Sequence, residues 1–344
     1  MRTGTSTKQT ILTGRRGAWH RRTLPKLRLM PVAIALLCLC LVVAGTLGAV
    51  RYVYTYGLYR GFAQPVLPSS VVVRQHGVAR RVAVIPASVH QITIASHALG
   101  GYPDPVDVVL PPGYTSHPWR RYPVLYLLEG SPGSPSNFLT IGEIGVADAE
   151  LVAAGRIQPL ILVVPAGGRS FFSDEEWANG LQPGNDWETF VARDLVNTID
   201  ARYRTVASSA WRGLAGLSEG GFGALNIGLH HPGEFRLLQS WSGYMHANPI
   251  LAVYGHDQRL LRYNSPALTV RAVAPQLRYH GTYIWFYSGT DDPLTPQNVA
   301  FQAELTALAI PHHYFLWPGA HDWGMWRTLA PRALIVASEH LGRG

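Results

Sequence analysis

The chain has 344 residues, of which 47% are hydrophobic and 15% charged, and this composition excludes a disordered chain, a coiled coil and a collagen-like repeat. Eight of the 29 lysines and arginines precede residue 31 with no acidic residue among them, which leaves 21 basic against 21 acidic residues in the rest of the chain. The net charge of +8 therefore belongs to an N-terminal tail, and the neutral body has no electrostatic footprint for a nucleic-acid partner.

A stretch of 20 residues without a charge, 31–50, follows the basic tail 1–30. This length suits a helix that crosses a bilayer, and the lysines and arginines before it orient the N-terminus toward the cytoplasm. We therefore expect a single-pass anchor in the cell membrane, with everything after Val50 outside the cytoplasm. A cleaved signal peptide stays open as an alternative, because Val42-Val43-Ala44 offers small residues to a peptidase, and cleavage there would give a secreted protein.

Both cysteines, Cys38 and Cys40, lie in this apolar stretch. The part of the chain outside the membrane then has no disulfide, no thiolate nucleophile and no cysteine metal site. Residues 51–85 show no clear periodicity and are interpreted as a juxtamembrane spacer. A single catalytic domain is expected over 86–344.

This domain alternates short apolar runs with helical patterns, which is typical of a mainly parallel sheet with helices on both faces. Eight strands are predicted, the first two antiparallel, at 91–96, 106–110, 124–128, 160–164, 213–217, 237–241, 283–287 and 314–317. Helices are predicted at 143–154, 187–203, 220–230, 296–309 and 323–341. The predicted fold class is α/β.

The segment Gly216-Leu217-Ser218-Glu219-Gly220 fits the G-x-S-x-G pattern of a nucleophile elbow. Flanking glycines leave room for a sharp strand-to-helix turn that presents a strained serine, and here a predicted strand ends at 217 and a predicted helix begins at 220. Ser218 is therefore predicted to be a nucleophile. An ordinary glycine-rich turn is the alternative.

A serine hydroxyl needs a histidine base, and the histidine needs a carboxylate that holds its tautomer. In α/β-hydrolases these residues follow in the order Ser, acid, His. The turn after strand 283–287 supplies Asp291 and Asp292, of which Asp292 is favoured, and the loop after the last strand supplies His321. The other aspartate is expected to begin the turn or to cap the following helix.

Two backbone N–H groups are needed to stabilise a tetrahedral intermediate, one after the nucleophile and one in a loop after an early strand. Glu219 supplies the first, and Ser131 is predicted to supply the second, with Gly130 letting the loop come close. An ordinary turn is again the alternative. Paired histidines elsewhere lack acidic partners at ligand spacing, and no cofactor motif is present, so neither a metal nor a cofactor is predicted.

Together these motifs resemble those of the esterase-D-like α/β-hydrolases, which include S-formylglutathione hydrolases, feruloyl esterases and mycolyltransferases. The similarity covers about residues 88–341 and rests on VLPPGY (109–114), LLEG (127–130), GLSEGG (216–221), HPGEF (231–235), GTDD (289–292) and GAHDW (319–323) with Trp326. The resemblance implies an α/β-hydrolase fold in which Ser218 is the nucleophile, Asp292 the acid and His321 the base.

Two positions depart from the family pattern. Glu129 stands where many of the family's esterases have histidine and where the mycolyltransferases have an acidic residue. Glu219 replaces the methionine or glutamine that is common after the nucleophile. An ionised carboxylate there would oppose the stabilisation of an oxyanion unless the side chain points away.

Aromatic side chains near the catalytic loops are candidates for a substrate pocket, with core packing as the alternative. They are Phe171, Phe172, Trp177, Trp187, Trp241, Tyr244, Trp323 and Trp326, and Glu129 is a further candidate for the pocket.

The sequence therefore predicts a membrane-anchored serine hydrolase outside the cytoplasm that cleaves a small-molecule, lipid or sugar ester through an acyl-enzyme. Two alternatives stay open. One is transfer of the acyl chain to a cell-envelope sugar or lipid, since the acyl-enzyme is shared and only the acceptor differs. The other is a binding domain whose triad is silent. Neither the acyl length nor the oligomeric state is predicted.

Overall fold

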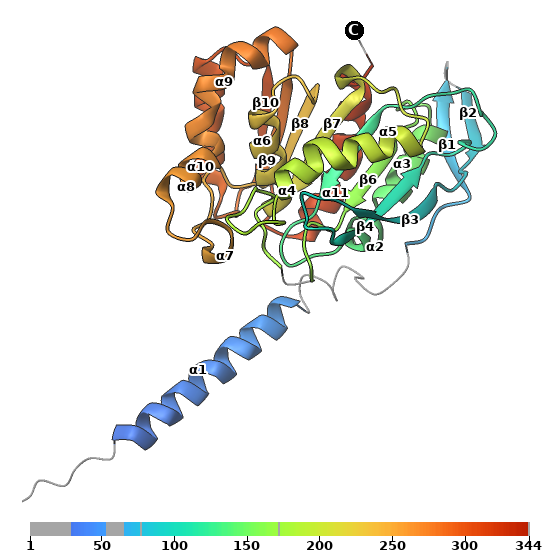
Figure 1. The fold of residues 1–344 in the computed structure, drawn as a ribbon. Coiled ribbons are helices and arrows are strands. Elements are labelled where there is room, and N and C mark those ends of the chain that lie inside the picture. The colour runs from blue at the N-terminus through green and yellow to red at the C-terminus, as the bar shows by residue number, and fades with distance from the viewer. Residues whose placement is uncertain (1–28, 53–64, 76–77, 171–172, 343–344) are drawn as a thin grey trace, which may run out of the picture. The chain divides into compact units, whose positions relative to one another are not determined.

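The computed structural model describes residues 29–52, 65–75, 78–170 and 173–342 (Figure 1). The chain divides into two compact units, Met1–Arg51 and Tyr52–Gly344. Helix α1 runs over Leu29–Tyr52 and includes the whole of the predicted apolar stretch, whereas the basic tail before Leu29 lies outside the described residues. Over the positions whose side chains are described, no helix reaches the length and hydropathy of a membrane span.

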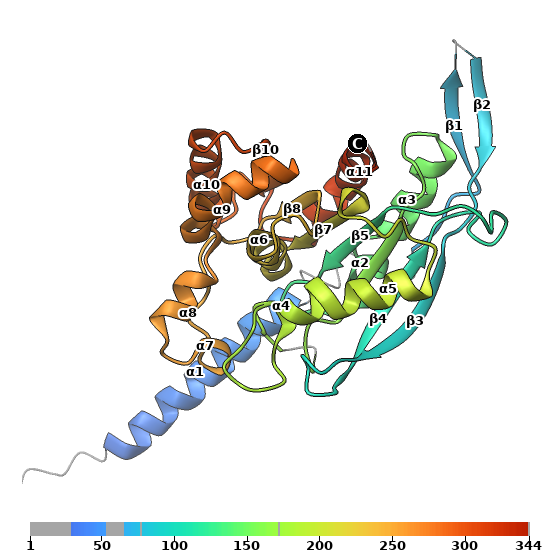
Figure 2. The same ribbon diagram turned by 45° about the horizontal axis from the view of Figure 1, so that its top comes forward.

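The predicted spacer contains a β-hairpin that the sequence analysis did not anticipate. Strands β1 (Ser70–Gln75) and β2 (Val78–Ala83) pair antiparallel, and β1 contacts helix α3 (Ile144–Ala153) (Figure 2). Val71 and Val73 of β1 are half-buried, whereas every residue of β2 except Val82 is exposed, so the hairpin lacks the strong apolar alternation by which a strand is usually recognised. Residues 70–75 and 78–83 of the predicted spacer are thus paired strands.

The predicted eight-stranded, mainly parallel sheet is confirmed. Its order is β10-β9-β8-β7-β5-β6-β4-β3, and every neighbouring pair from β6 to β10 is parallel, whereas β4 is antiparallel to both β6 and β3. The strands are β3 Ser88–Ala95, β4 Pro103–Leu110, β5 Val124–Leu128, β6 Ile161–Pro165, β7 Arg212–Leu217, β8 Leu237–Trp241, β9 Tyr283–Gly289 and β10 His312–Trp317.

Helices cover both faces of the sheet (Figures 1 and 2). On one face lie α4 (Trp187–Thr189), α5 (Val196–Arg202), α6 (Glu219–His230), α9 (Pro266–His280) and α10 (Thr295–Ala307), and on the other lie α2 (Pro135–Thr140), α3 and α11 (Trp323–His340). Successive residues of the central strands alternate between the two layers: Tyr126 belongs to the first core and Leu127 to the second. The central strands are therefore apolar on both faces and contribute side chains to both halves of the core.

The predicted helices are all present, with two kinds of difference. The helix expected over 187–203 is interrupted by a π-helical segment, Phe190–Leu195. Four α-helices of the described residues were not predicted, namely α2, α7 (Leu251–Tyr254), α8 (Gln258–Tyr263) and α9. In α9, Pro275 lies inside the helix and is exposed, and a proline in a helical pattern usually indicates an end.

Candidate active site

The candidate site lies at the carboxyl ends of the parallel strands. Strand β5 lies between β6 and β7, so the chain leaves β5 and returns on either side of it, which is the topological switch point where α/β sheets place their sites. Ser218 follows β7, Ser131 follows β5, Asp292 follows β9 and His321 follows β10. Residues far apart in the chain are thereby brought to one edge of the sheet.

Ser218 occupies a strained turn between β7 and α6. Its φ of 53° and ψ of −118° are unusual for a residue with a side chain. A Cβ on Gly216 would lie 2.2 Å from the Gly220 carbonyl oxygen, and a Cβ on Gly220 would lie 1.9 Å from the Leu128 carbonyl oxygen. Both glycines of the motif are therefore required for β7, α6 and β5 to approach this closely.

The structure brings three of the predicted site residues into one hydrogen-bonded chain. His321 Nε2 lies 2.9 Å from Ser218 Oγ, and His321 Nδ1 lies 3.0 Å from Asp292 Oδ2. The Asp292 side chain is buried, whereas the His321 side chain keeps 19% of its surface exposed. Trp326 packs against the imidazole at 86° with the ring centroids 5.0 Å apart, which restrains the ring between its two partners.

Asp292 and not Asp291 faces the histidine. Burial by itself would raise the pKa of Asp292, but hydrogen bonds from His321 and from the Leu294 N–H stabilise the carboxylate and hold its pKa below the usual value. Asp291 is exposed, and its N–H donates to the Gly319 carbonyl oxygen at 2.9 Å, which ties the two catalytic loops together.

The loop after β5 approaches the nucleophile closely. A Cβ on Gly130 would lie 2.9 Å from the Leu217 side chain and 3.1 Å from the Ser218 Cβ. Ser131 follows Gly130 in this loop, and its hydroxyl group donates to the Ser173 carbonyl oxygen at 3.1 Å. At the other side of the site, the Glu219 N–H is at the first position of α6, where backbone N–H groups have no partner within the helix.

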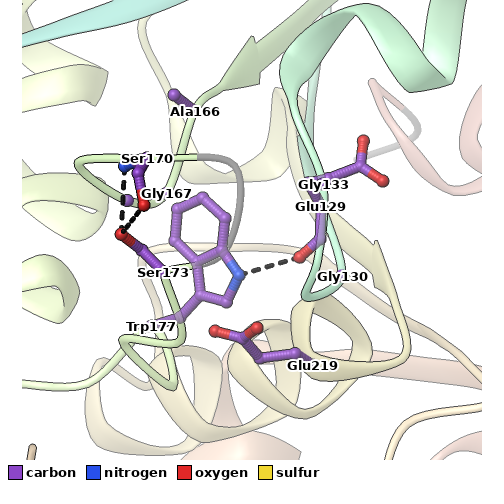
Figure 3. Close-up of a pocket in the computed structure, with 10 residues that line it drawn as sticks. Glu129, Gly130, Gly133, Ala166, Gly167, Ser170, Ser173, Trp177 and Glu219 are labelled. Carbon is purple, nitrogen blue, oxygen red and sulfur yellow. Dashed lines mark hydrogen bonds between the residues drawn. The ribbon is translucent and has the colours of Figure 1, made fainter. Parts of the chain in front are cut away.

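Two glutamates and an indole line a small cavity beside this loop (Figure 3). The cavity measures about 10 Å³ and is lined by Glu129, Gly130, Gly133, Ala166, Gly167, Gly168, Ser170, Ser173, Trp177 and Glu219. Figure 3 shows the carboxyl groups of Glu129 and Glu219 pointing in different directions, and the Trp177 indole donating to the Glu129 carbonyl oxygen at 3.0 Å. Burial raises the pKa of both glutamates well above the usual value.

Most of the aromatic pocket candidates are buried instead of facing a substrate cleft. Trp241 and Trp323 pack edge-to-face on Phe138 in the core under the sheet, and Trp187 packs on Trp177. Trp326 is buried against His321, and Tyr244 stacks on Phe222. Core packing thus explains these side chains, with Trp177 the one that also lines the small cavity. Phe171 and Phe172 lie outside the described residues.

A buried glutamate that the sequence analysis missed lies next to Glu219. Glu176 has a positive φ of 53° and is fully buried. Its carboxyl oxygens accept hydrogen bonds from the Tyr244 hydroxyl at 2.6 Å and from the Asn248 side chain and N–H at 2.8 and 3.1 Å. The signal in the sequence was the acidic run Asp174-Glu175-Glu176 directly before Trp177, which surface exposure would equally explain.

Comparison with known proteins identifies the family. The Esterase family model matches residues 96–336, more than two thirds of the chain. Esterase Rv1288 of Mycobacterium tuberculosis is 38% identical over 146 residues, which cover 42% of this chain and 30% of the relative. The match therefore spans less than a third of the length of that curated relative.

Two further comparisons bear on fold and chemistry. The solved structure of a ferulic acid esterase is similar with a TM-score of 0.66 at 26% identity, covering 75% of this chain and 100% of the other. The diacylglycerol acyltransferase/mycolyltransferase Ag85B of Mycolicibacterium smegmatis is 27% identical over 215 residues, 48% of this chain and 63% of that protein. The predicted α/β-hydrolase fold is thereby confirmed.

Proposed function

This chain belongs to the Esterase family, and on that premise we propose that it is a carboxylic ester hydrolase that cleaves esters through a Ser218–His321–Asp292 triad. The observation that carries the proposal is the unbroken chain of hydrogen bonds from Ser218 Oγ through the imidazole to Asp292, at 2.9 and 3.0 Å. This geometry meets the requirement of a nucleophile, its base and the group that orients the base.

In the proposed reaction, His321 Nε2 accepts the proton of Ser218 Oγ as this oxygen attacks the ester carbonyl. The resulting oxyanion is stabilised by the N–H groups of Ser131 and Glu219. The imidazolium then donates its proton to the departing alkoxide, which leaves as an alcohol. The acyl group remains bound to Ser218 Oγ as an acyl-enzyme. Water attacks the acyl-enzyme with His321 again as base, and the carboxylic acid is released.

Ester turnover by the full chain in mild detergent tests this proposal. We expect the wild type to hydrolyse p-nitrophenyl esters of short acyl chains and Ser218→Ala to lose at least a thousandfold in kcat/KM, since removal of a nucleophile leaves only binding and the oxyanion hole. His321→Ala is expected to lose a similar factor. Equal activity of wild type and Ser218→Ala would refute the triad.

Acyl transfer is a second candidate function, because a protein named as an acyltransferase and mycolyltransferase is among the relatives. The same acyl-enzyme would then be attacked by a hydroxyl group of a sugar or lipid instead of water. Adding trehalose or glycerol at increasing concentration separates the two functions. A transferase would give acylated acceptor at the expense of free acid, whereas a hydrolase would give free acid throughout.

We also propose that α1 anchors the protein in the cell membrane, with the catalytic domain outside the cytoplasm. The uncharged stretch 31–50 and the basic tail before it support this orientation. A protein released from the membrane after cleavage near Ala44 is the alternative. Carbonate extraction of membranes followed by N-terminal sequencing distinguishes them: an anchored chain stays in the pellet with its basic tail, and a cleaved chain does not.

A further inference from the structure

The side chain of Glu219 lies in a place where a charge is strongly disfavoured. Its exposed fraction is 5%, and the cavity that it shares with the oxyanion loop has room for about one water molecule. The residues described as lining this cavity include no lysine, arginine or histidine. Among the described lining residues a carboxylate there has no cation to stabilise it and room for at most about one water molecule, and it would lie beside the position at which the oxyanion forms.

The surrounding groups favour the neutral form further. The Glu219 carboxyl group accepts the N–H of Glu176, and the ionisable groups near it are Asp174, Glu175 and Glu176 together with Glu129 across the cavity. Two tyrosines, Tyr244 and Tyr254, complete the cluster and direct their hydroxyl groups at Glu176. No cation contributes to this cluster among the described residues that act on Glu219.

Glu176 and Glu219 differ in how well their negative charge is solvated by the protein. Glu176 accepts hydrogen bonds from Tyr244, from two groups of Asn248 and, at 3.5 Å, from Tyr254. Burial raises its pKa to about 7, so it is ionised at mildly alkaline pH. Glu219 has one backbone donor and an anionic neighbour, and two neighbouring buried carboxylates do not both ionise readily.

We propose that Glu219 works as a neutral carboxylic acid, kept protonated by the ionised Glu176 beside it, so that the residue supplying an oxyanion N–H brings no negative charge to the site. Glu176 is a positioning residue in this account, since it acts through Glu219 and does not touch the reacting atoms. The proposal rests on the proposed triad. It predicts that ester turnover falls on the alkaline side, when Glu219 loses its proton and its charge repels the oxyanion.

The pH dependence of kcat/KM on a p-nitrophenyl ester tests this, with the full chain and with Ser218→Ala as the background. We expect the wild-type rate to fall at alkaline pH and the fall to be absent in Glu219→Gln, whatever the plateau rate of that variant. In Glu176→Gln the neighbouring charge is lost, so Glu219 ionises more easily and the fall is expected about one pH unit lower. Glu129→Gln is the matched control, because it removes another buried carboxyl group of the same cavity and leaves Glu219 in place, so a fall at alkaline pH is expected to remain.

A second readout does not depend on catalysis. If the folded chain holds a proton on Glu219 that the unfolded chain releases, the wild type loses stability as the pH rises, whereas Glu219→Gln does not lose this contribution. The unfolding constant of the wild type divided by that of Glu219→Gln then rises up to tenfold per pH unit above pH 5. A ratio independent of pH would overturn the proposal, even in a protein without Ser218-dependent turnover. An alkaline fall that persists in Glu219→Gln, that vanishes in Glu129→Gln, or that moves to higher pH in Glu176→Gln would overturn it as well.

Discussion

At the residue scale, the site depends on side chains whose roles are fixed by their partners. Ser218, Asp292 and His321 could be predicted because each stands in a short motif next to a strand end, and the chain order of the three is that of an α/β-hydrolase. Glu176 could not be predicted in the same way. Its partners, Tyr244 and Asn248, lie about 70 residues away in the chain, and only the fold brings them to it.

The choice between the two adjacent aspartates gives a matched pair of variants. Asp292→Asn removes the carboxylate that orients His321, and we expect kcat to fall about a thousandfold to ten-thousandfold because the imidazole is held in the wrong tautomer. Asp291→Asn changes an exposed side chain and is expected to stay within threefold of the wild type. Steady-state kinetics on one ester decide the matter, and the reverse ranking of the two variants would assign the acid to Asp291.

At the element scale, the strands were predicted more accurately than the helices. Strands β5 and β8 match the predicted bounds because they are buried on both faces, and continuous apolar runs between turn residues mark such strands clearly. The β1–β2 hairpin and α9 were missed for two different reasons. The hairpin is largely exposed and lacks a continuous apolar run, and α9 contains an internal proline.

Alanine substitutions at two helical glycines distinguish the effect of close packing on stability from the effect of helix propensity. Gly220→Ala would place a Cβ 1.9 Å from the Leu128 carbonyl oxygen, so β5 and α6 must move apart, and we expect a loss of about 1–3 kcal/mol in stability together with loss of activity. Gly145→Ala in α3 meets nothing within 4 Å and is expected to stabilise the chain by about 0.5–1 kcal/mol. Urea unfolding of both variants measures these changes. A Gly220→Ala protein as stable as Gly145→Ala would show that the elbow is not closely packed.

Helix α3 also contains a buried aspartate, Asp148, which lowers the stability of the fold at neutral pH. Both carboxyl oxygens of Asp148 are buried without a hydrogen-bond partner among the described residues, and burial raises its pKa to about 8. The folded chain must then bind a proton that the unfolded chain releases above pH 4, so the stabilising effect of this proton is complete below pH 4 and is lost as the pH rises toward 8.

We therefore expect Asp148→Asn to raise the free energy of unfolding by up to about 5 kcal/mol at pH 7.5, because its amide needs no proton to become neutral. At pH 4 the two proteins should be nearly equally stable. Urea unfolding at the two pH values measures the difference. A variant that is less stable than the wild type at both would mean that Asp148 has an ionised partner in the fold.

At the scale of the whole molecule, the chain combines an Esterase-family domain with an N-terminal region of different composition. Residues 31–50 contain no charge, and the domain from residue 96 onward matches the Esterase family to residue 336. Composition and periodicity predict this division into a tail, an apolar stretch and a domain. They could not predict the acyl group or the acceptor, because these depend on the shape of the surface around Ser218 and not on the spacing of motifs.

The central claim is that Ser218 is an activated nucleophile, and covalent labelling of the full chain tests it most directly. A fluorophosphonate probe reacts with a serine whose hydroxyl is activated by a base, and intact mass with peptide mapping then locates the adduct. We predict one adduct per chain on Ser218, labelling that fails in Ser218→Ala and His321→Ala, and competition by ester substrates. A folded wild-type protein that stays unlabelled, or that is labelled at another serine, would contradict the account.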